Sequence, residues 1–201
     1  MRTAFFDVDT QLDFLYPAGA LYVPKAEALE PGIAALNRLA ALHGIVVIST
    51  MDAHTEDDIE FHQWPPHCVS GTAGQHKPAS TLLDRRVTVP SAPMPWKIEG
   101  AHQILLEKQT TDCFTNANLT ALLDALQVQR AVVYGVVTEI CVKNAALGLL
   151  NTGRQVEVVT DAVECLNEAA AREFYAELTR RGGRLVDLAS VEAEIRSYAI
   201  S

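Results

Sequence analysis

The 201-residue chain lacks the features that mark an extracellular or membrane protein. Its four cysteines form no CxxC pair, and its first residues do not resemble a signal peptide. We therefore expect free thiols in a cytoplasmic protein rather than a disulfide framework. No apolar run approaches the roughly eighteen residues that are needed to span a bilayer.

Positive charge is also scarce. The chain has 16 Lys and Arg against 25 Asp and Glu, which leaves a net charge of −9. Nucleic acid and anionic membrane surfaces are therefore not expected as main partners. Apolar residues make up 49% of the chain, enough for a full core, and there is no internal repeat or linker. We expect one domain that spans residues 1–201.

Short apolar runs alternate with helical patterns along the whole chain. The predicted strands are residues 3–8, 45–49, 104–106, 131–134, 156–159 and 185–188. The predicted helices are residues 30–42, 118–126, 169–180 and 191–198, together with a helix that holds Cys141 and runs to about residue 150. A polar stretch over residues 51–95 holds at most a short strand near Val87. This order predicts an α/β fold with three layers, in which a mainly parallel sheet lies between helices. Ligands of such sheets bind beyond the carboxyl ends of the strands.

A possible nucleophile follows the fourth of these strands, in the run Gly135-Val136-Val137-Thr138-Glu139-Ile140-Cys141-Val142. If Thr138 caps the next helix, Cys141 lies in its first turn, where free N–H groups and the helix dipole favour a thiolate. The alternative is that Cys141 is a small buried hydrophobic residue.

Two charged residues at the same edge could assist such a cysteine. Asp9 ends the first strand and could accept the thiol proton, although a role as a turn cap is equally open. Asp7 and Asp13 compete for the same role, and strand alternation predicts that Asp7 points the same way as Asp9. Lys108 follows the third strand, where it could keep Asp9 ionised and stabilise the thiolate, or could simply be solvated.

A metal site is predicted by Asp52, His54 and His67. Asp52 and His54 alternate at a strand end, and the loop Trp64-Pro65-Pro66 could return His67 to them. Two imidazoles and a carboxylate suit Zn²⁺, Fe²⁺ or Mn²⁺. A polar surface loop without metal is the alternative. The sequence does not choose a further ligand among Glu60, Asp58 and His62.

Several of these motifs, in this order and spacing, resemble the nicotinamidase/isochorismatase-like cysteine hydrolases. The resemblance covers roughly residues 3–187 and rests on the runs Asp9-Thr10-Gln11-Leu12-Asp13-Phe14, Asp52-Ala53-His54, Trp64-Pro65-Pro66-His67-Cys68-Val69-Ser70-Gly71-Thr72, on Lys108, and on the run that contains Cys141. The segment from Trp64 to Thr72 is especially similar to the nicotinamidase/pyrazinamidase branch.

The resemblance implies an isochorismatase-like hydrolase fold and an Asp9–Lys108–Cys141 triad. It implies a cis peptide bond between Val136 and Val137, and an oxyanion hole formed by the N–H groups of Val137 and Cys141. The substrate-binding residues that it implies are Phe14, Trp64, Val136 and Ile140. It also implies a divalent metal on Asp52, His54 and His67, and a homo-oligomer.

The function implied is hydrolysis of a small carboxamide such as nicotinamide, through a thioester, to the acid and ammonia. The chain departs from the branch at Ala53 and Ile140, where an aromatic residue and Tyr or His are usual, and its loop after Lys108 is shorter. Two other functions therefore stay open. One is a hydrolase of a different amide or ureido substrate with a vacant or structural metal site, and the other is a binding domain without activity.

Overall fold

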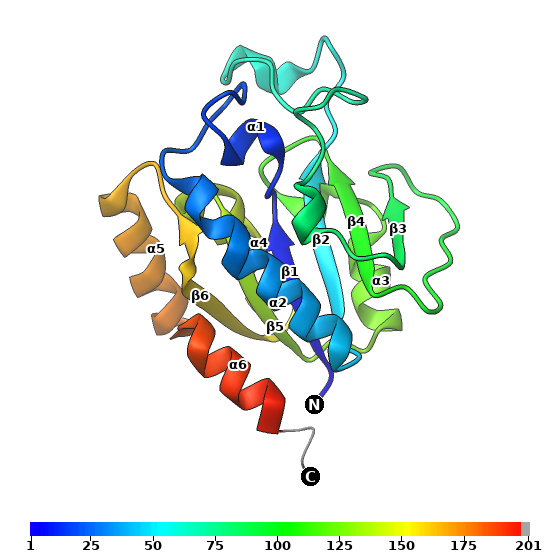
Figure 1. The fold of residues 1–201 in the computed structure, drawn as a ribbon, viewed down its shortest axis with the longest axis vertical. Helices are drawn as coiled ribbons and strands as arrows, with labels where there is room; N and C mark the ends of the chain where they lie inside the picture. The colour runs from blue at the N-terminus through cyan, green and yellow to red at the C-terminus, as the bar shows by residue number, and fades with distance from the viewer. Residues whose placement is uncertain (198–201) are drawn as a thin grey trace.

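Seven parallel strands form the central sheet of the computed structural model, which describes residues 1–197 (Figure 1). The strands are β1 (Thr3–Val8), β2 (Val46–Asp52), β3 (Arg86–Val89), β4 (Gln103–Lys108), β5 (Arg130–Val136), β6 (Gln155–Glu164) and β7 (Arg184–Val186). Their order in the sheet is β3-β4-β2-β1-β5-β6-β7. The chain moves to one side of β1 to build β2 to β4 and to the other side to build β5 to β7, so the direction of winding changes between β1 and β5.

Helices cover both faces of this sheet. The helices are α1 (Leu12–Leu15), α2 (Glu30–Leu42), α3 (Leu119–Ala125), α4 (Lys143–Asn151), α5 (Glu168–Arg180) and α6 (Leu188–Ser197), with 3₁₀ turns η1 (Ala26–Leu29), η2 (Ile59–His62), η3 (Ala79–Thr81) and η4 (Cys113–Thr115) and a π turn η5 (Thr138–Val142). Helices α2 and α6 contact each other on the face that is nearer the viewer in Figure 1. Helix α4 packs on β5 and β6 with α5 beside it. The predicted three-layer α/β fold is confirmed.

Some boundaries differ from the prediction. Strand β4 extends to Lys108, so this lysine ends a strand and does not follow one. Leu188 opens α6 and is not part of the last strand. The last predicted helix reached Tyr198, which lies outside the described residues. The prediction of one domain over residues 1–201 stays a prediction for the same reason.

The core explains why the strands read as continuous apolar runs. Every residue of β5 is buried, and β1 is buried from Ala4 onward, because helices cover both faces.

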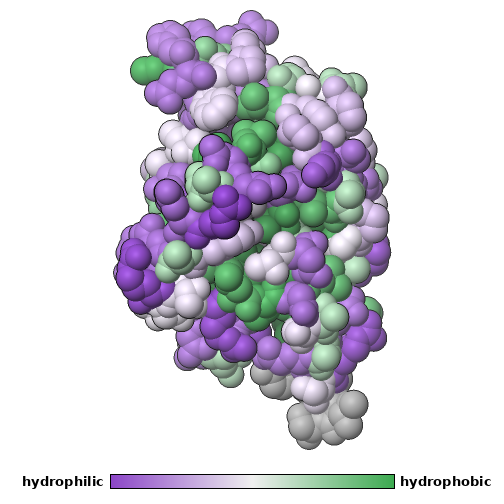
Figure 2. Space-filling model, turned by 90° about the vertical axis from the view of Figure 1, so that its left-hand side faces the viewer, coloured by the Kyte–Doolittle hydropathy of each residue, from purple (hydrophilic) through white to green (hydrophobic). Residues whose placement is uncertain are grey.

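The side of the molecule shown in Figure 2 exposes a band of apolar side chains bordered by hydrophilic ones. Within residues 1–197, no helix is long and apolar enough to cross a membrane. All four cysteines are free thiols, as predicted.

Gly135 brings the ends of the two central strands together. Its φ is +117°, and a Cβ there would lie 2.1 Å from the carbonyl oxygen of Val8. No other residue type fits this approach without displacing backbone. The turn that follows β5 therefore starts directly beside the end of β1.

Candidate active site

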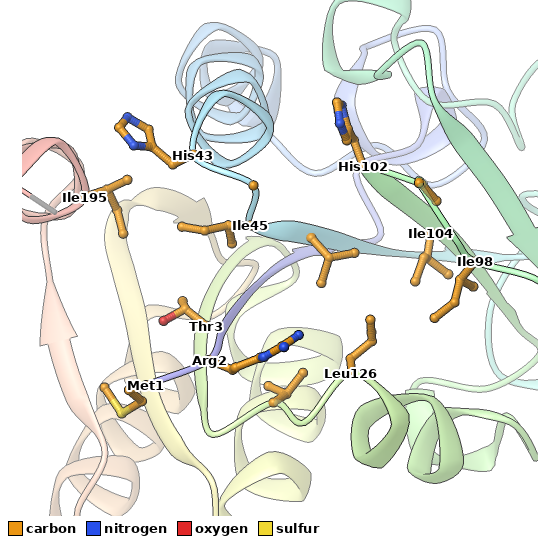
Figure 3. Close-up of a pocket in the computed structure, with 15 residues that line it drawn as sticks. Met1, Arg2, Thr3, His43, Ile45, Ile98, His102, Ile104, Leu126 and Ile195 are labelled. Carbon is orange, nitrogen blue, oxygen red and sulfur yellow. The ribbon is translucent and has the colours of Figure 1, made fainter. Parts of the chain in front are cut away.

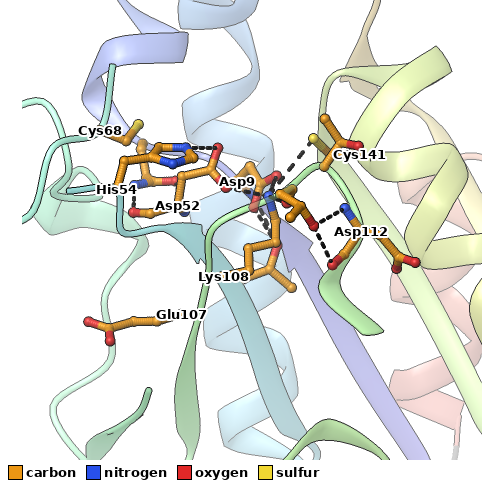
Figure 4. Close-up of polar contacts among 12 residues, drawn as sticks. Asp9, Asp52, His54, Cys68, Glu107, Lys108, Asp112 and Cys141 are labelled. Atoms are coloured by element: carbon orange, nitrogen blue, oxygen red, sulfur yellow. Dashed lines mark hydrogen bonds and ion pairs between the residues drawn. The ribbon is translucent and has the colours of Figure 1, made fainter. Parts of the chain in front are cut away.

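The change of winding direction between β1 and β5 is where ligands bind in open α/β sheets, and the predicted reactive residues meet there. Lys108 Nζ lies 2.8 Å from Asp9 Oδ2 and 4.0 Å from Cys141 Sγ. It also contacts Asp52 Oδ1 and donates to the carbonyl oxygen of Thr110 at 2.9 Å. Figure 4 shows the Lys108 side chain rising between Asp9, Asp52 and Cys141. The structure thus brings the three residues of the expected triad together.

The orientation of Asp9 comes from its backbone and corrects a prediction. Asp9 lies one residue beyond β1 and adopts a left-handed conformation with φ of +49°. Its carboxylate accepts a hydrogen bond from Thr50 Oγ1 at 2.6 Å, whereas Asp7 accepts one from Ser49 Oγ at 2.8 Å. Ser49 and Thr50 alternate along β2, so Asp7 and Asp9 face opposite sides of the sheet. The predicted common direction is wrong because the chain turns at Asp9.

Neither competing aspartate is directed at the cysteine. Asp7 pairs with Lys77 at 3.4 Å and accepts from Thr10 Oγ1 at 2.5 Å. Asp13 accepts from the amide of Cys68 at 2.7 Å and from that of Ala20 at 2.9 Å. Both carboxylates therefore hold loops and strands in place, and Asp9 is the aspartate beside Cys141.

Cys141 does not lie in the first turn of an α-helix, contrary to the prediction. It lies in the π turn η5, which Val137 precedes, and the side chain of Thr138 makes no cap. Burial raises the pKa of the Cys141 thiol well above its ordinary value, with Lys108 opposing this shift and the carboxylates of Asp9 and Asp52 adding to it. The resting sulfur is therefore a neutral thiol, and the reaction needs a base.

The three charged groups around Lys108 have different proton affinities. Burial raises the pKa of Asp9, although the charge of Lys108 opposes the shift. Burial acts in the same direction on Asp52, but Lys108 and two histidines hold its pKa well below the usual range. Burial lowers the pKa of Lys108, but Asp52 and Asp9 raise it well above its ordinary value. Asp9 is consequently the carboxylate of the cluster that binds a proton more readily than Asp52 does.

Asp52, His54 and His67 form a group whose chemistry fits a divalent metal. One ligand atom from each lies within 4.8 Å of the others, and all three residues are buried. Asp52 Oδ2 lies 3.8 Å from His54 Nε2 and 3.7 Å from His67 Nε2. The buried His54 Nε2 has no hydrogen-bond partner among the described residues.

The opposite ring nitrogens of the histidines are anchored. His54 Nδ1 lies 3.0 Å from Asp58 Oδ2, and His67 Nδ1 lies 2.8 Å from the carbonyl oxygen of Pro65. With Nδ1–H donated to these oxygens, the Nε2 lone pairs of both rings, which lie near Asp52 Oδ2, are free to bind a metal.

The structure separates the three candidates for a further ligand. Asp58 is occupied by His54 and by the amide of Glu60. His62 is exposed. Glu60 lines the same pocket as Asp52 and His67, and burial together with the charge of Asp52 raises its pKa.

A small cavity of about 80 Å³ opens above Cys141. Of the predicted substrate-binding residues, Phe14, Trp64 and Ile140 line it. Val136 is buried in the core, and its neighbour Val137 lines the cavity. The peptide bond between these two valines is cis, as the resemblance implied.

Sequence reasoning missed part of this wall. The additional lining residues are Leu21, Tyr22, Val23, Thr111 and Leu166. They come from three separate loops and follow no periodic pattern, so the only sequence signal is the short apolar run at Leu21 to Val23.

A larger cavity of about 690 Å³ lies at the opposite edge of the sheet (Figure 3). Its ionisable side chains include Arg2, His43 and His102, and neither a cysteine nor a carboxylate is among its described lining residues. Size therefore does not identify the reactive site in this protein.

Comparison with known proteins supports the resemblance. The family model of the isochorismatase domain matches residues 85–190, more than half of the chain. An uncharacterized isochorismatase family protein, PncA of Bacillus subtilis (strain 168), is 26% identical over 174 residues, which cover 84% of this chain and 89% of the relative.

Solved structures agree. A pyrazinamidase of Pyrococcus horikoshii in complex with zinc is 27% identical to this chain, with a TM-score of 0.77. The match covers 93% of this chain and 99% of the pyrazinamidase chain. A pyrazinamidase/nicotinamidase from Streptococcus mutans UA159 is 25% identical, with a TM-score of 0.78. The match covers 92% of this chain and 99% of the Streptococcus chain.

Proposed function

The chain belongs to the isochorismatase family, and from this premise we propose that it is a cysteine amidohydrolase of a small, neutral, nicotinamide-like carboxamide. The observation that carries this proposal is the meeting of Cys141 Sγ, Lys108 Nζ and the Asp9 carboxylate beside one small cavity. A structural cysteine has no need of a buried lysine and a proton-accepting carboxylate at its side.

The reaction proceeds in two halves. Asp9 accepts the proton of the Cys141 thiol as the sulfur attacks the amide carbonyl, and the N–H groups of Val137 and Cys141 stabilise the oxyanion. Such a donor lowers the barrier by about 3 kcal/mol in comparable hydrolases. Asp9 then gives its proton to the departing nitrogen, which leaves as ammonia, and a thioester remains. Water, deprotonated by Asp9, attacks the thioester and releases the acid, while the proton returns to the sulfur.

Lys108 stays charged throughout this cycle. Its pKa is raised by Asp52 and Asp9, so it does not donate its proton. The lysine cation offsets the negative charge that forms on the sulfur and keeps Asp9 within reach of it.

The wall of the cavity favours a neutral, flat substrate. Phe14, Trp64 and Ile140 supply aromatic and apolar surface, and neither Lys nor Arg is among the described lining residues. A substrate with a carboxylate tail would therefore bury its charge with neither Lys nor Arg among the described lining residues to pair with it. Within the alternative function, a different amide or ureido substrate, this disfavours substrates that carry a carboxylate.

The metal site is consistent with the same substrate class. Asp52, His54 and His67 would hold the ion, and Glu60 is the candidate for a further ligand. A bound divalent ion would act as a Lewis acid that can coordinate the ring nitrogen of a heteroaromatic amide. The zinc in the Pyrococcus pyrazinamidase supports Zn²⁺ as the first choice, ahead of Fe²⁺ and Mn²⁺. A homo-oligomeric state and a cytoplasmic location stay predictions.

The direct test is ammonia release from purified protein. We expect release from nicotinamide and pyrazinamide, much less from N-carbamoyl amino acids, and none from the Cys141→Ala variant. Rapid quenching in acid should trap an acyl group on Cys141, detectable by mass spectrometry of the peptide. Release from carbamoyl amino acids in preference to the aromatic amides would replace the proposed substrate class, and release from none of them would favour a binding domain.

A further inference from the structure

Residues Thr10 to Asp13 are hydrogen-bonded, through backbone and side chains, to the loop that carries His67. The amide of Leu12 donates to the His76 carbonyl oxygen at 2.8 Å, and that of Asp13 donates to the Gly74 carbonyl oxygen at 3.1 Å. The side chains of Thr10 and Asp13 add contacts to Lys77 Nζ at 2.9 Å and to the Cys68 amide at 2.7 Å. The segment that follows the catalytic aspartate therefore also holds the predicted metal-binding loop.

Gln11 lies in the middle of this hydrogen-bonded segment and is fully buried. Its Nε2 donates to the carbonyl oxygens of Asp52 and Gln75, both at 2.8 Å. Its Oε1 accepts from the amide of Asp52 at 2.7 Å. Both N–H groups and the oxygen of the side-chain amide are thus used, and two of the three bonds go to the backbone of one residue.

This double contact replaces strand pairing that the Asp9 turn interrupts. Strand β1 pairs with β2 only as far as Val8 and Thr50. A side-chain amide offers the same donor and acceptor as a peptide group. Gln11 therefore continues the hydrogen bonding of the sheet to Asp52, the last residue of β2.

Asp52 needs a defined orientation because it serves both halves of the site. Its Oδ1 contacts Lys108, and its Oδ2 faces the Nε2 atoms of His54 and His67 at 3.8 Å and 3.7 Å. A small rotation of the Asp52 backbone would move the carboxylate relative to both. Gln11 lines no described cavity, so substrate contact does not account for its amide.

We propose that Gln11 is a positioning residue that sets the Asp52 carboxylate for simultaneous contact with Lys108 and the metal, a role that rests on the proposed function. Groups that orient a metal ligand typically change metal affinity 10- to 100-fold when they are removed. The inference is therefore testable through metal binding alone.

The test uses Gln11→Met, which keeps the length of the side chain and removes its hydrogen bonds. Gln103→Met is the matched control, because Gln103 is also fully buried and makes bonds of 2.8 Å to Ser49 Oγ, 3.2 Å to the Thr81 carbonyl oxygen and 2.7 Å to the Leu83 amide. Zn²⁺ affinity of the metal-free proteins is measured by competition with a chromophoric chelator, alongside thermal unfolding.

We expect both variants to lose stability, but only Gln11→Met to bind Zn²⁺ at least tenfold more weakly, with the control within twofold of the unmodified protein. Unchanged Zn²⁺ affinity in folded Gln11→Met, or an equal loss in Gln103→Met, would overturn the proposal. Should Gln11→Met not fold, Gln11→Asn decides the question, since it keeps the amide but shortens its reach, and the same tenfold loss is expected. If the unmodified protein hydrolyses no amide while this affinity difference persists, the proposed function fails and the role of Gln11 in orienting Asp52 stands.

Discussion

Two buried aspartate–lysine pairs start from the same stretch of chain, two residues apart, and have different surroundings. Asp7 pairs with Lys77 at 3.4 Å on the face that α2 covers, and Asp9 pairs with Lys108 at 2.8 Å on the other face. The first pair is surrounded by hydrogen-bonding side chains of Thr10, Ser49 and Asn37. The second lies beside a thiol, a group of metal-binding type and a cavity.

The difference shows that residue type and burial do not by themselves make a reactive site. A buried ion pair whose hydrogen bonds are satisfied has a structural role, and removing one of its partners destabilises the fold. In the Asp9 pair, the carboxylate has a raised pKa. The nearby His54 Nε2 has no hydrogen-bond partner among residues 1–197. Such groups are available to a substrate or metal.

The largest expected effect separates the two aspartates in catalysis. Asp9→Asn keeps the shape of the side chain but removes the base, so kcat/KM for the amide should fall by about 10³-fold or more. Asp7→Asn should leave kcat/KM of the folded enzyme within about tenfold of the original, because Asp7 does not contact the thiol. Steady-state ammonia release checks both values. Equal losses in the two variants would remove the distinction between the pairs.

The next effect separates the pairs in stability. Lys77→Met leaves Asp7 buried without its cation, and we expect it to lower the free energy of unfolding by about 3 kcal/mol or more, as measured by urea denaturation. Asp7→Asn combined with Lys77→Met should recover part of this loss, since no charge is then left unpaired. A Lys77→Met variant as stable as the original would show that the Asp7 pair is not structural.

Stabilisation by bound metal should depend on the residues near the Asp9–Lys108 pair and not on the Asp7–Lys77 pair. Zn²⁺ at about 100 times its Kd should raise the free energy of unfolding by about 2.7 kcal/mol, because it binds only the folded state. His54→Ala should abolish most of this gain, whereas Lys77→Met, although less stable, should keep it in full. Thermal unfolding with and without Zn²⁺ provides the measurement. A gain that survives His54→Ala would place the metal elsewhere.

The smallest effect concerns the protonation of Cys141 in the metal-free protein. Since burial raises the thiol pKa well above its ordinary value, thiolate absorbance near 240 nm should be absent at pH 7 and appear only at a pH above the ordinary titration range of a cysteine thiol. The difference spectrum between the protein and Cys141→Ser reports this one group. A full thiolate signal at pH 7 would mean that Lys108 outweighs burial and the two carboxylates.

Much of the site could be predicted because local patterns carry it. Asp9, Asp52 and Lys108 stand at or next to the carboxyl ends of apolar strands, Cys141 follows one within a short turn, and parallel strands end at the same edge. The proline-containing loop before His67 likewise predicted a return to Asp52. What failed was the expected common direction of Asp7 and Asp9 and the α-helical first turn at Cys141. The backbone at Asp9 turns left-handed and the chain after β5 forms a π turn, and no periodicity in the sequence reports either.

The sequence by itself determined the strands, the layer order and the set of residues that reach one edge, because hydrophobic periodicity and chain order are local properties. Only the tertiary structure decided which of three aspartates lies beside the cysteine, and which of Glu60, Asp58 and His62 lines the pocket beside the metal ligands. It alone also shows that Gln11 is hydrogen-bonded to the backbone of Asp52. These depend on contacts between residues tens of positions apart, such as Gln11 with Asp52 and Gln75. The free energy of such contacts comes from burial and geometry, which exist only once the sheet has assembled.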